Sequence, residues 1–136
     1  MEKSVQYLFV YGSLRKGFGH SMYNFIDTHF TWISNAKVKG LLYDAGEYPA
    51  AIPSVSPVFI TGELYLMKPG TEAKEVWSYL DVYEGLFPQP GEEVLFRREK
   101  AMVQASGTAT EAWIYWYNLP VNDLPVITSG DILQYR

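Results

Sequence analysis

An apolar run followed by small residues, Val5-Gln6-Tyr7-Leu8-Phe9-Val10-Tyr11-Gly12-Ser13-Leu14-Arg15, stands near the N-terminus. Residues 5–11 contain a single polar interruption, Gln6, which is typical of a strand buried on both faces. Gly12 ends the strand, because glycine turns the backbone without steric cost. The N–H groups of such a loop can bind a carboxylate, a phosphate or an oxyanion. An ordinary strand-to-helix turn fits the same residues, so both interpretations stay open.

The segments that follow predict one short helix and two strands. Ser21 is the expected N-cap of a helix over residues 22–26, and residues 36–43 read as the second strand. Residues 44–53 are dense in turn residues and predict a loop. Tyr48 in that loop either walls a pocket or belongs to a plain crossover, and the plain crossover is the favoured interpretation.

Residues 58–67 read as a third strand with alternating apolar side chains on one face. Glu63 falls on the opposite face of this strand, where we expect a carboxylate exposed to solvent.

A helix is expected after Pro69-Gly70, with Thr71 as its cap. Residues spaced by 0, 4, 7 and 11 positions lie on one face of a helix. In this helix those positions are Ala73, Trp77, Leu80 and Glu84, so Glu84 continues the apolar face. Gly85 fits a helix stop. A glutamate that faces the core has a raised pKa and is a candidate general acid or base. The alternatives are a salt bridge, for instance to Arg15, Arg97 or Arg98, and an early helix end that leaves Glu84 exposed.

The second half of the chain predicts a hairpin. Residues 94–104 and the aromatic run 112–117 read as its strands, with Ser106-Gly107-Thr108 as the turn. No internal repeat or linker is visible, so we expect residues 1–136 to form a single α+β domain.

Composition narrows the classes of function. A net charge of −4 argues against nucleic acid and anionic membranes as partners. No apolar run reaches the roughly 20 residues of a membrane span, and residues 1–4 run directly into the first strand, so we expect no signal peptide. The absence of cysteine excludes disulfides and thiolate catalysis and fits a reducing, cytoplasmic location. The two histidines do not suggest a metal site.

Two motifs at a particular spacing resemble a known family. Tyr11-Gly12-Ser13-Leu14-Arg15, followed some seventy residues later by Leu80-Asp81-Val82-Tyr83-Glu84-Gly85, is similar to the γ-glutamylcyclotransferase-like family. The branch that it resembles most contains the AIG2-like proteins and the γ-glutamylamine cyclotransferases. Shorter matches, among them Gly62-Glu63-Leu64-Tyr65 and Ser129-Gly130-Asp131, extend the resemblance over nearly the whole chain.

The resemblance implies a mixed β-barrel with flanking helices and a pocket at the first loop. It implies that Tyr11, Gly12, Ser13 and Leu14 bind the γ-glutamyl part of a small-molecule substrate and that Glu84 is the acid/base. The family often has a tyrosine where this chain has Phe96. The implied reaction releases 5-oxoproline from a γ-glutamyl amine or peptide and needs no cofactor or metal.

This chemistry suits the residue types. One glutamate of raised pKa can take a proton from the substrate's α-amine and return it to the leaving amine. The loop N–H groups can hold the α-carboxylate or the developing oxyanion. The alternative is a non-catalytic module that binds a small ligand on the same fold, which would have no need to keep a carboxylate facing its core. The sequence does not indicate the oligomeric state.

Overall fold

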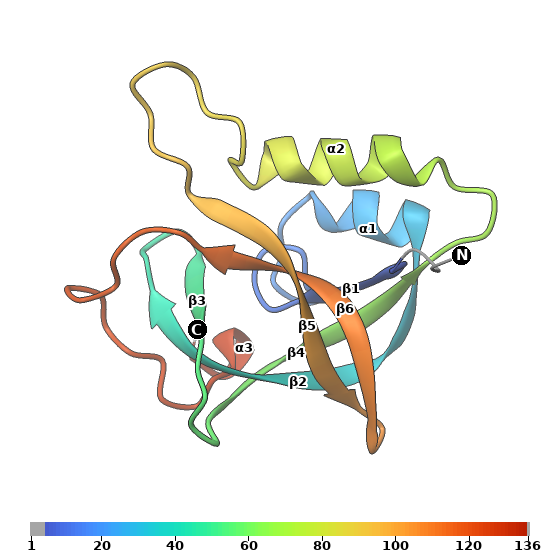
Figure 1. Ribbon diagram of the computed structural model, residues 1–136. Coiled ribbons are helices and arrows are strands. Elements are labelled where there is room, and N and C mark those ends of the chain that lie inside the picture. The colour runs from blue at the N-terminus through green and yellow to red at the C-terminus, as the bar shows by residue number, and fades with distance from the viewer. Residues whose placement is uncertain (1–4, 136) are drawn as a thin grey trace.

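The computed structural model describes residues 5–135, so the predicted absence of a signal peptide at residues 1–4 lies outside the described part. Three helices and six strands are found there (Figure 1). In chain order they are β1 Tyr7–Val10, α1 Tyr23–His29, β2 Phe30–Asp44, β3 Pro49–Pro53, β4 Phe59–Met67, α2 Ala73–Tyr83, β5 Phe96–Ala105, β6 Thr108–Tyr117 and α3 Ile132–Tyr135. No helix in this part of the chain is both long and apolar enough to cross a membrane.

Five of the strands close into a mixed barrel. The sheet order is β3-β2-β4-β1-β6-β5, and a further pairing between β2 and β5 joins the ends of the five-stranded portion. The closing pairs are Ala36 with Ala105 and Lys37 with Gln104. β1 runs parallel to β6 and antiparallel to β4. The predicted α+β fold with a mixed β-barrel and flanking helices is therefore confirmed, and β1 is an interior strand of the sheet.

β1 is buried on both faces, as its apolar run predicts. Phe9 belongs to the cluster inside the barrel, whereas Leu8 and Val10 pack in a second cluster with residues of α1 and α2. These three side chains are at most 3% exposed. Burying an apolar side chain of this size contributes about 1.5–3 kcal/mol. The strand that leads into the Gly12 loop is thus anchored from both sides, which makes it a rigid support for that loop.

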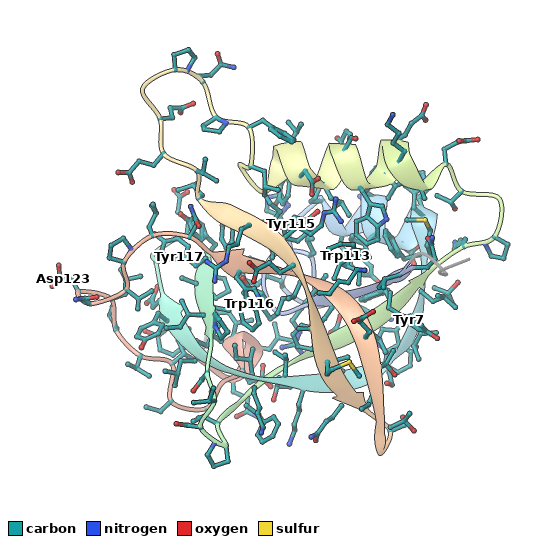
Figure 2. All side chains as sticks on the ribbon, viewed as in Figure 1. Tyr7, Trp113, Tyr115, Trp116, Tyr117 and Asp123 are labelled. Carbon is teal, nitrogen blue, oxygen red and sulfur yellow. The ribbon has the colours of Figure 1, made fainter. Side chains whose placement is uncertain are left out.

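The aromatic side chains of β6 alternate between the same two clusters. Trp116 lies with the barrel interior, while Tyr115 and Tyr117 belong to the cluster shared with the helices (Figure 2). Alternation follows from the two-residue period of a strand. Tyr115 is thereby directed toward the side of the barrel that α2 covers.

Two strand boundaries differ from the prediction. β2 begins at Phe30, directly after α1, and not at residue 36. The predicted loop over residues 44–53 is a loop only as far as Tyr48, because Pro49–Pro53 pairs with β2 as a strand. The turn residues mark the tight turn before β3, in which the Gly46 N–H donates to Asp44 Oδ1 at 2.8 Å. Proline is tolerated at the ends of β3 because that strand lies at an edge of the sheet.

Neither predicted N-cap side chain accepts a hydrogen bond from a helix N–H group. The N-cap positions are Met22 for α1 and Glu72 for α2, and neither makes a side-chain cap bond. At α1 the Met22 N–H instead donates to His20 Nδ1 at 2.9 Å. The predictions for Ser21 and Thr71 were therefore wrong, because the helices begin one residue later than the cap geometry requires.

Candidate functional site

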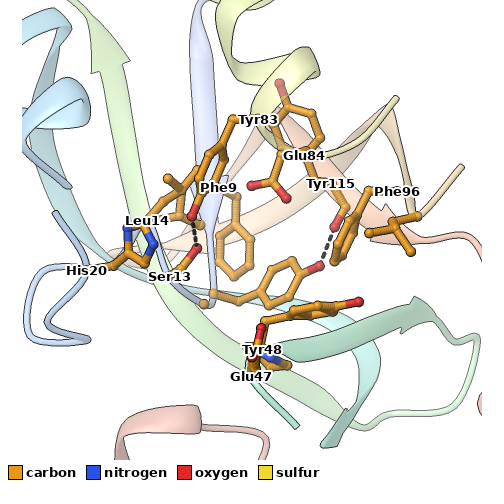
Figure 3. A pocket seen from close by; sticks show the side chains of 15 residues that line it. Phe9, Ser13, Leu14, His20, Glu47, Tyr48, Tyr83, Glu84, Phe96 and Tyr115 are labelled. Carbon is orange, nitrogen blue, oxygen red and sulfur yellow. Dashed lines mark hydrogen bonds between the residues drawn. The ribbon is translucent and has the colours of Figure 1, made fainter. Parts of the chain in front are cut away.

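A cavity of about 290 Å³ opens where the loop after β1, the turn before β3 and the end of α2 meet. Its lining combines both predicted motifs with aromatic residues of β5 and β6 (Figure 3). The lining residues are Phe9, Val10, Tyr11, Gly12, Ser13, Leu14, His20, Glu47, Tyr48, Pro49, Tyr83, Glu84, Leu95, Phe96 and Tyr115. The structure therefore brings all five predicted site residues to one cavity.

The loop after β1 offers three free backbone donors. The Arg15 N–H donates to the Gly12 carbonyl at 2.9 Å and closes a tight turn. The N–H groups of Gly12, Ser13 and Leu14 donate no hydrogen bond to any residue in the described range 5–135. Consecutive free donors of this kind suit an anionic oxygen. Their engagement by one common ligand oxygen stays a prediction.

Glu84 is placed by the way α2 ends. It is the C-cap residue, and Gly85 follows with a φ of 81°. The Leu86 N–H donates to the Asp81 carbonyl at 3.0 Å and the Gly85 N–H to the Val82 carbonyl at 3.1 Å, which is a Schellman motif. This helix end directs the Glu84 carboxyl group into the cavity that the Gly12 loop lines (Figure 3).

The Glu84 carboxyl is half-buried and has no partner. It makes no hydrogen bond or salt bridge with the residues that the structure describes. Burial, with the negative charge of Asp81 as the second cause, raises its pKa from 4.5 to about 8. A carboxyl group with this pKa exchanges its proton near neutral pH, which suits a general acid or base.

The arginines considered as partners for Glu84 pair elsewhere. Arg15 contacts Glu63 at 3.3 Å and Asp131 at 2.9 Å, and Arg98 contacts Asp81 at 2.7 Å. Arg97 contacts Glu99 at 3.1 Å on the surface. The salt-bridge alternative for Glu84 is therefore wrong in this structure, as is the alternative of a fully exposed side chain.

Glu63 differs from its prediction. It is only 5% exposed, because both faces of β4 are covered. Its Oε1 accepts hydrogen bonds from the Lys16 N–H at 3.1 Å and from the Tyr65 hydroxyl at 2.9 Å, in addition to its salt bridge with Arg15. The prediction of a solvent-exposed carboxylate was therefore wrong, because Glu63 is buried and bonded to partners from distant parts of the chain.

Aromatic side chains form one wall of the cavity. Tyr48 lies against Phe96, with 5.6 Å between the ring centroids, and Phe96 lies 5.5 Å from Tyr117. The Tyr48 ring also lies 6.4 Å from the Tyr117 ring, measured between centroids. The favoured interpretation of the Tyr48 segment as a plain crossover was wrong, because Glu47, Tyr48 and Pro49 all line the cavity.

A polar contact lies across the cavity from this wall. Ser13 Oγ and the Tyr83 hydroxyl share a hydrogen bond of 2.9 Å (Figure 3). The His20 ring meets the edge of Tyr83 at a centroid distance of 5.8 Å. Ser13 thereby connects the loop after β1 to the last turn of α2.

A buried hydrogen-bond network next to the end of α2, centred on Asp81, was not predicted. Asp81 is 7% exposed and receives hydrogen bonds from Arg98 and from the Tyr115 hydroxyl. One signal in the sequence pointed to it: position 81 is four residues after Trp77 and three before Glu84, so it shares their helical face. Its partners come from β5 and β6 and could not be read from local spacing.

Metal-ligating side chains do not gather at this site. Among residues 5–135 no group of three or more His, Asp or Glu side chains is placed to hold a metal ion. His20 lies at the cavity, and His29 packs against Phe25 at a centroid distance of 4.5 Å.

Comparisons of the sequence and of the structure with known proteins point to the same family. The model of the family described as "Gamma-glutamyl cyclotransferase, AIG2-like" matches residues 8–134. The gamma-glutamylcyclotransferase family protein YtfP of Escherichia coli strain K12 is 32% identical over 134 residues, covering 93% of this chain and 96% of that protein. The solution NMR structure of ytfP from Escherichia coli is similar with a TM-score of 0.51 and 30% identity, covering 95% of this chain and 97% of the other. An AIG2-like protein crystal structure from Mus musculus has a TM-score of 0.67 at 20% identity, covers 91% of this chain and 86% of the other, and shows a shared fold.

Proposed function

Since this chain belongs to the gamma-glutamyl cyclotransferase, AIG2-like family, we propose that it is a cyclotransferase acting on a small γ-glutamyl amine or peptide. In this proposal Glu84 is the general acid/base, and the segment Tyr11-Gly12-Ser13-Leu14 binds the γ-glutamyl part. One observation carries it: an unpaired, half-buried carboxyl and three free backbone donors line the same cavity.

The reaction is an intramolecular acyl transfer. The substrate's α-nitrogen gives a proton to the Glu84 carboxylate and attacks the γ-carbonyl carbon. The carbonyl oxygen becomes an oxyanion, which the N–H groups of Gly12, Ser13 and Leu14 are suited to stabilise. The bond from the γ-carbon to the leaving nitrogen then breaks as that nitrogen is protonated. Two protons move overall from the α-nitrogen to the leaving nitrogen, and the carboxylate is regenerated.

The raised pKa of Glu84 supports this role. Its pKa of about 8 lies much closer to that of an amine than the ordinary carboxyl value of 4.5 does, which lowers the free-energy cost of taking a proton from the substrate's α-ammonium. General acid/base catalysis is most efficient when the two pKa values lie near the operating pH. Cyclisation also needs the substrate folded back on itself, and we propose that the cavity walls supply this orientation.

Release of 5-oxoproline from a panel of γ-glutamyl amines and γ-glutamyl peptides tests the proposal. We expect turnover of at least one substrate by the wild type and a loss of about 10²- to 10⁴-fold in kcat for Glu84→Gln, with KM largely kept. Glu75→Gln is the matched control, because Glu75 is an exposed carboxylate on the outer side of the same helix. Wild-type turnover in Glu84→Gln would refute the acid/base role.

The binding-module alternative has a distinct outcome in the same experiment. A pure binding protein would bind members of the panel, measured by calorimetry, and release no 5-oxoproline. Binding would then be equal in the wild type and in Glu84→Gln, apart from any contact of the carboxyl with the ligand.

A further inference from the structure

Asp81 is held from two strands at once. Arg98 on β5 donates to both of its carboxylate oxygens, from Nε to Oδ1 at 2.7 Å and from Nη2 to Oδ2 at 3.1 Å. The Tyr115 hydroxyl on β6 donates to Oδ1 at 2.8 Å. A two-pronged arginine–carboxylate pair has a defined geometry, which a single hydrogen bond does not impose. The orientation of the Asp81 side chain is therefore set by the barrel.

Arg98 is itself fixed between aromatic rings. Its guanidinium carbon lies 5.0 Å from the centroid of Trp77 and 4.4 Å from that of Trp113. Trp77 belongs to α2 and Trp113 to β6, so the guanidinium joins the helix to the barrel. Cation–π contacts of this kind favour a fixed, charged arginine.

The same network reaches both halves of the proposed site. Asp81 lies one helical turn before Glu84, and its carbonyl accepts the Leu86 N–H that completes the end of α2. Tyr115 lines the cavity, and its backbone carbonyl accepts a hydrogen bond from the Tyr11 hydroxyl. A chain of contacts thus runs from the loop after β1 through Tyr115 and Asp81 to the end of the helix that carries Glu84.

Several titratable or charged groups line the cavity that holds Glu84 or pack next to it. They come from the loop after β1, the turn before β3, α2, β5 and β6, and they are Tyr11, His20, Glu47, Tyr48, Asp81, Tyr83, Arg97, Arg98 and Tyr115. Burial raises the pKa of Tyr11 and of Tyr115 above the ordinary value, which leaves both hydroxyls neutral. Glu47 is exposed at the cavity mouth, where solvent screens its charge. Asp81 is the buried carboxylate of this set.

Resting on the proposed role of Glu84, we propose that Asp81 is a positioning residue for the acid/base. Fixed by Arg98 and Tyr115, it holds the end of α2 against the barrel and places its carboxylate one helical turn from Glu84. That charge favours the protonated form of Glu84, so it adjusts the pH at which the acid/base exchanges its proton.

The test is a titration of the Glu84 carboxyl that requires no turnover. Proteins labelled with ¹³C at glutamate carboxyls are titrated by NMR, and the Glu84 signal is identified by its loss in Glu84→Gln. We expect Asp81→Asn to lower the Glu84 pKa by about one unit, since a nearby like charge is removed. Glu99→Gln is the matched control, because it removes a carboxylate that also pairs with an arginine of β5 but is exposed. That variant should leave the Glu84 titration unchanged.

A second variant is needed because Asp81→Asn leaves the partly buried Arg98 guanidinium without its carboxylate, which can prevent folding. The double variant Asp81→Asn with Arg98→Gln removes both charges and keeps two polar side chains that can bond to each other. We expect the Glu84 pKa to fall here too, because the charge that raises it comes from Asp81 on the same helix and not from Arg98 on β5. An unchanged Glu84 titration in either folded variant would overturn the proposal.

Kinetics separates this proposal from the proposed function. With an active substrate, the acid limb of the kcat/KM profile of Asp81→Asn should shift to lower pH by the same amount as the NMR titration. If the wild type turns over no substrate, the proposed function fails, while the NMR titration still decides the effect of Asp81 on Glu84. A lower kcat at every pH with no shift of the profile would assign Asp81 a purely structural role and contradict the proposal.

Discussion

Glu84 connects the chemistry of the cavity to the stability of the protein. Its pKa is about 8 in the folded state, against an ordinary value of 4.5. Between these two values the folded state keeps a proton that the unfolded state has released. Stability from this group is therefore fully present below pH 4.5 and is lost as the pH rises toward 8.

A stability profile of Glu84→Gln tests this linkage. Below pH 4.5 both side chains are neutral, so the two proteins should differ little in their free energy of unfolding. As the pH rises to 8, the wild type should lose up to a few kcal/mol relative to the variant, because each pKa unit corresponds to about 1.4 kcal/mol. Urea unfolding at a series of pH values gives the difference. Parallel profiles of the wild type and Glu84→Gln would contradict the raised pKa, and Glu75→Gln should run parallel to the wild type.

The end of α2 is the element on which the position of Glu84 depends. Gly85 has a φ of 81°, a left-handed conformation in which a side chain is strained. A Cβ at this position would lie 3.5 Å from Leu95, an ordinary contact, so the cost of a substitution is conformational. Gly70 precedes the same helix with the same φ of 81°, and a Cβ added there would meet no atom within 4 Å.

These two glycines allow a matched comparison. Gly85→Ala and Gly70→Ala should each destabilise the protein by about 1 kcal/mol, measured by urea unfolding, because both force alanine into the left-handed region. Only Gly85→Ala should also lower kcat for 5-oxoproline release, since it disturbs the turn that directs Glu84 into the cavity. Equal activity in the two variants would show that Glu84 reaches its position without this helix end.

Some helices and strands could be predicted from their own residues, and others could not. The prediction of α2 succeeded because its apolar face and its terminal glycine are both local signals. The hairpin of β5 and β6 was predicted because Ser106-Gly107 is a turn signal. Both residues have positive φ in the structure, as a tight hairpin turn requires. β3 was missed because an edge strand bounded by two prolines has no local strand signal. The first six residues of β2 were missed because their pairing with β4, at positions such as Phe30 with Met67, supplies what their sequence pattern does not.

At the scale of the whole molecule, barrel closure creates the site. Pairing of β1 with β6 places the Gly12 loop beside Tyr115, and packing of α2 on the barrel adds Glu84 to the same cavity. The motifs alone predicted the loop and Glu84, since each has a local signal. Asp81, Tyr48 and the buried state of Glu63 depend on contacts between distant segments, so residue spacing could not reveal them.

A second buried network connects three such distant segments. Arg15 from the loop after β1 lies between Glu63 on β4 and Asp131 near the C-terminus, and it also donates to the Thr61 carbonyl at 3.3 Å. The Arg15 and Glu63 side chains are 5% and 7% exposed. Removing the cation leaves a buried carboxylate without its counter-charge, and breaking such a pair typically costs about 3–5 kcal/mol.

We expect Arg15→Gln to lower the free energy of unfolding at pH 7 by about 3 kcal/mol, because Glu63 keeps its hydrogen bonds from Lys16 and Tyr65. The matched control is Arg97→Gln, whose salt bridge with Glu99 is exposed and should be worth at most about 1 kcal/mol. Urea unfolding of the wild type and the two variants at pH 7 measures both losses. If the two variants lose equal stability, the Arg15 network does not hold the loop and the C-terminal segment on the barrel, and the rigidity of the loop comes from β1 alone.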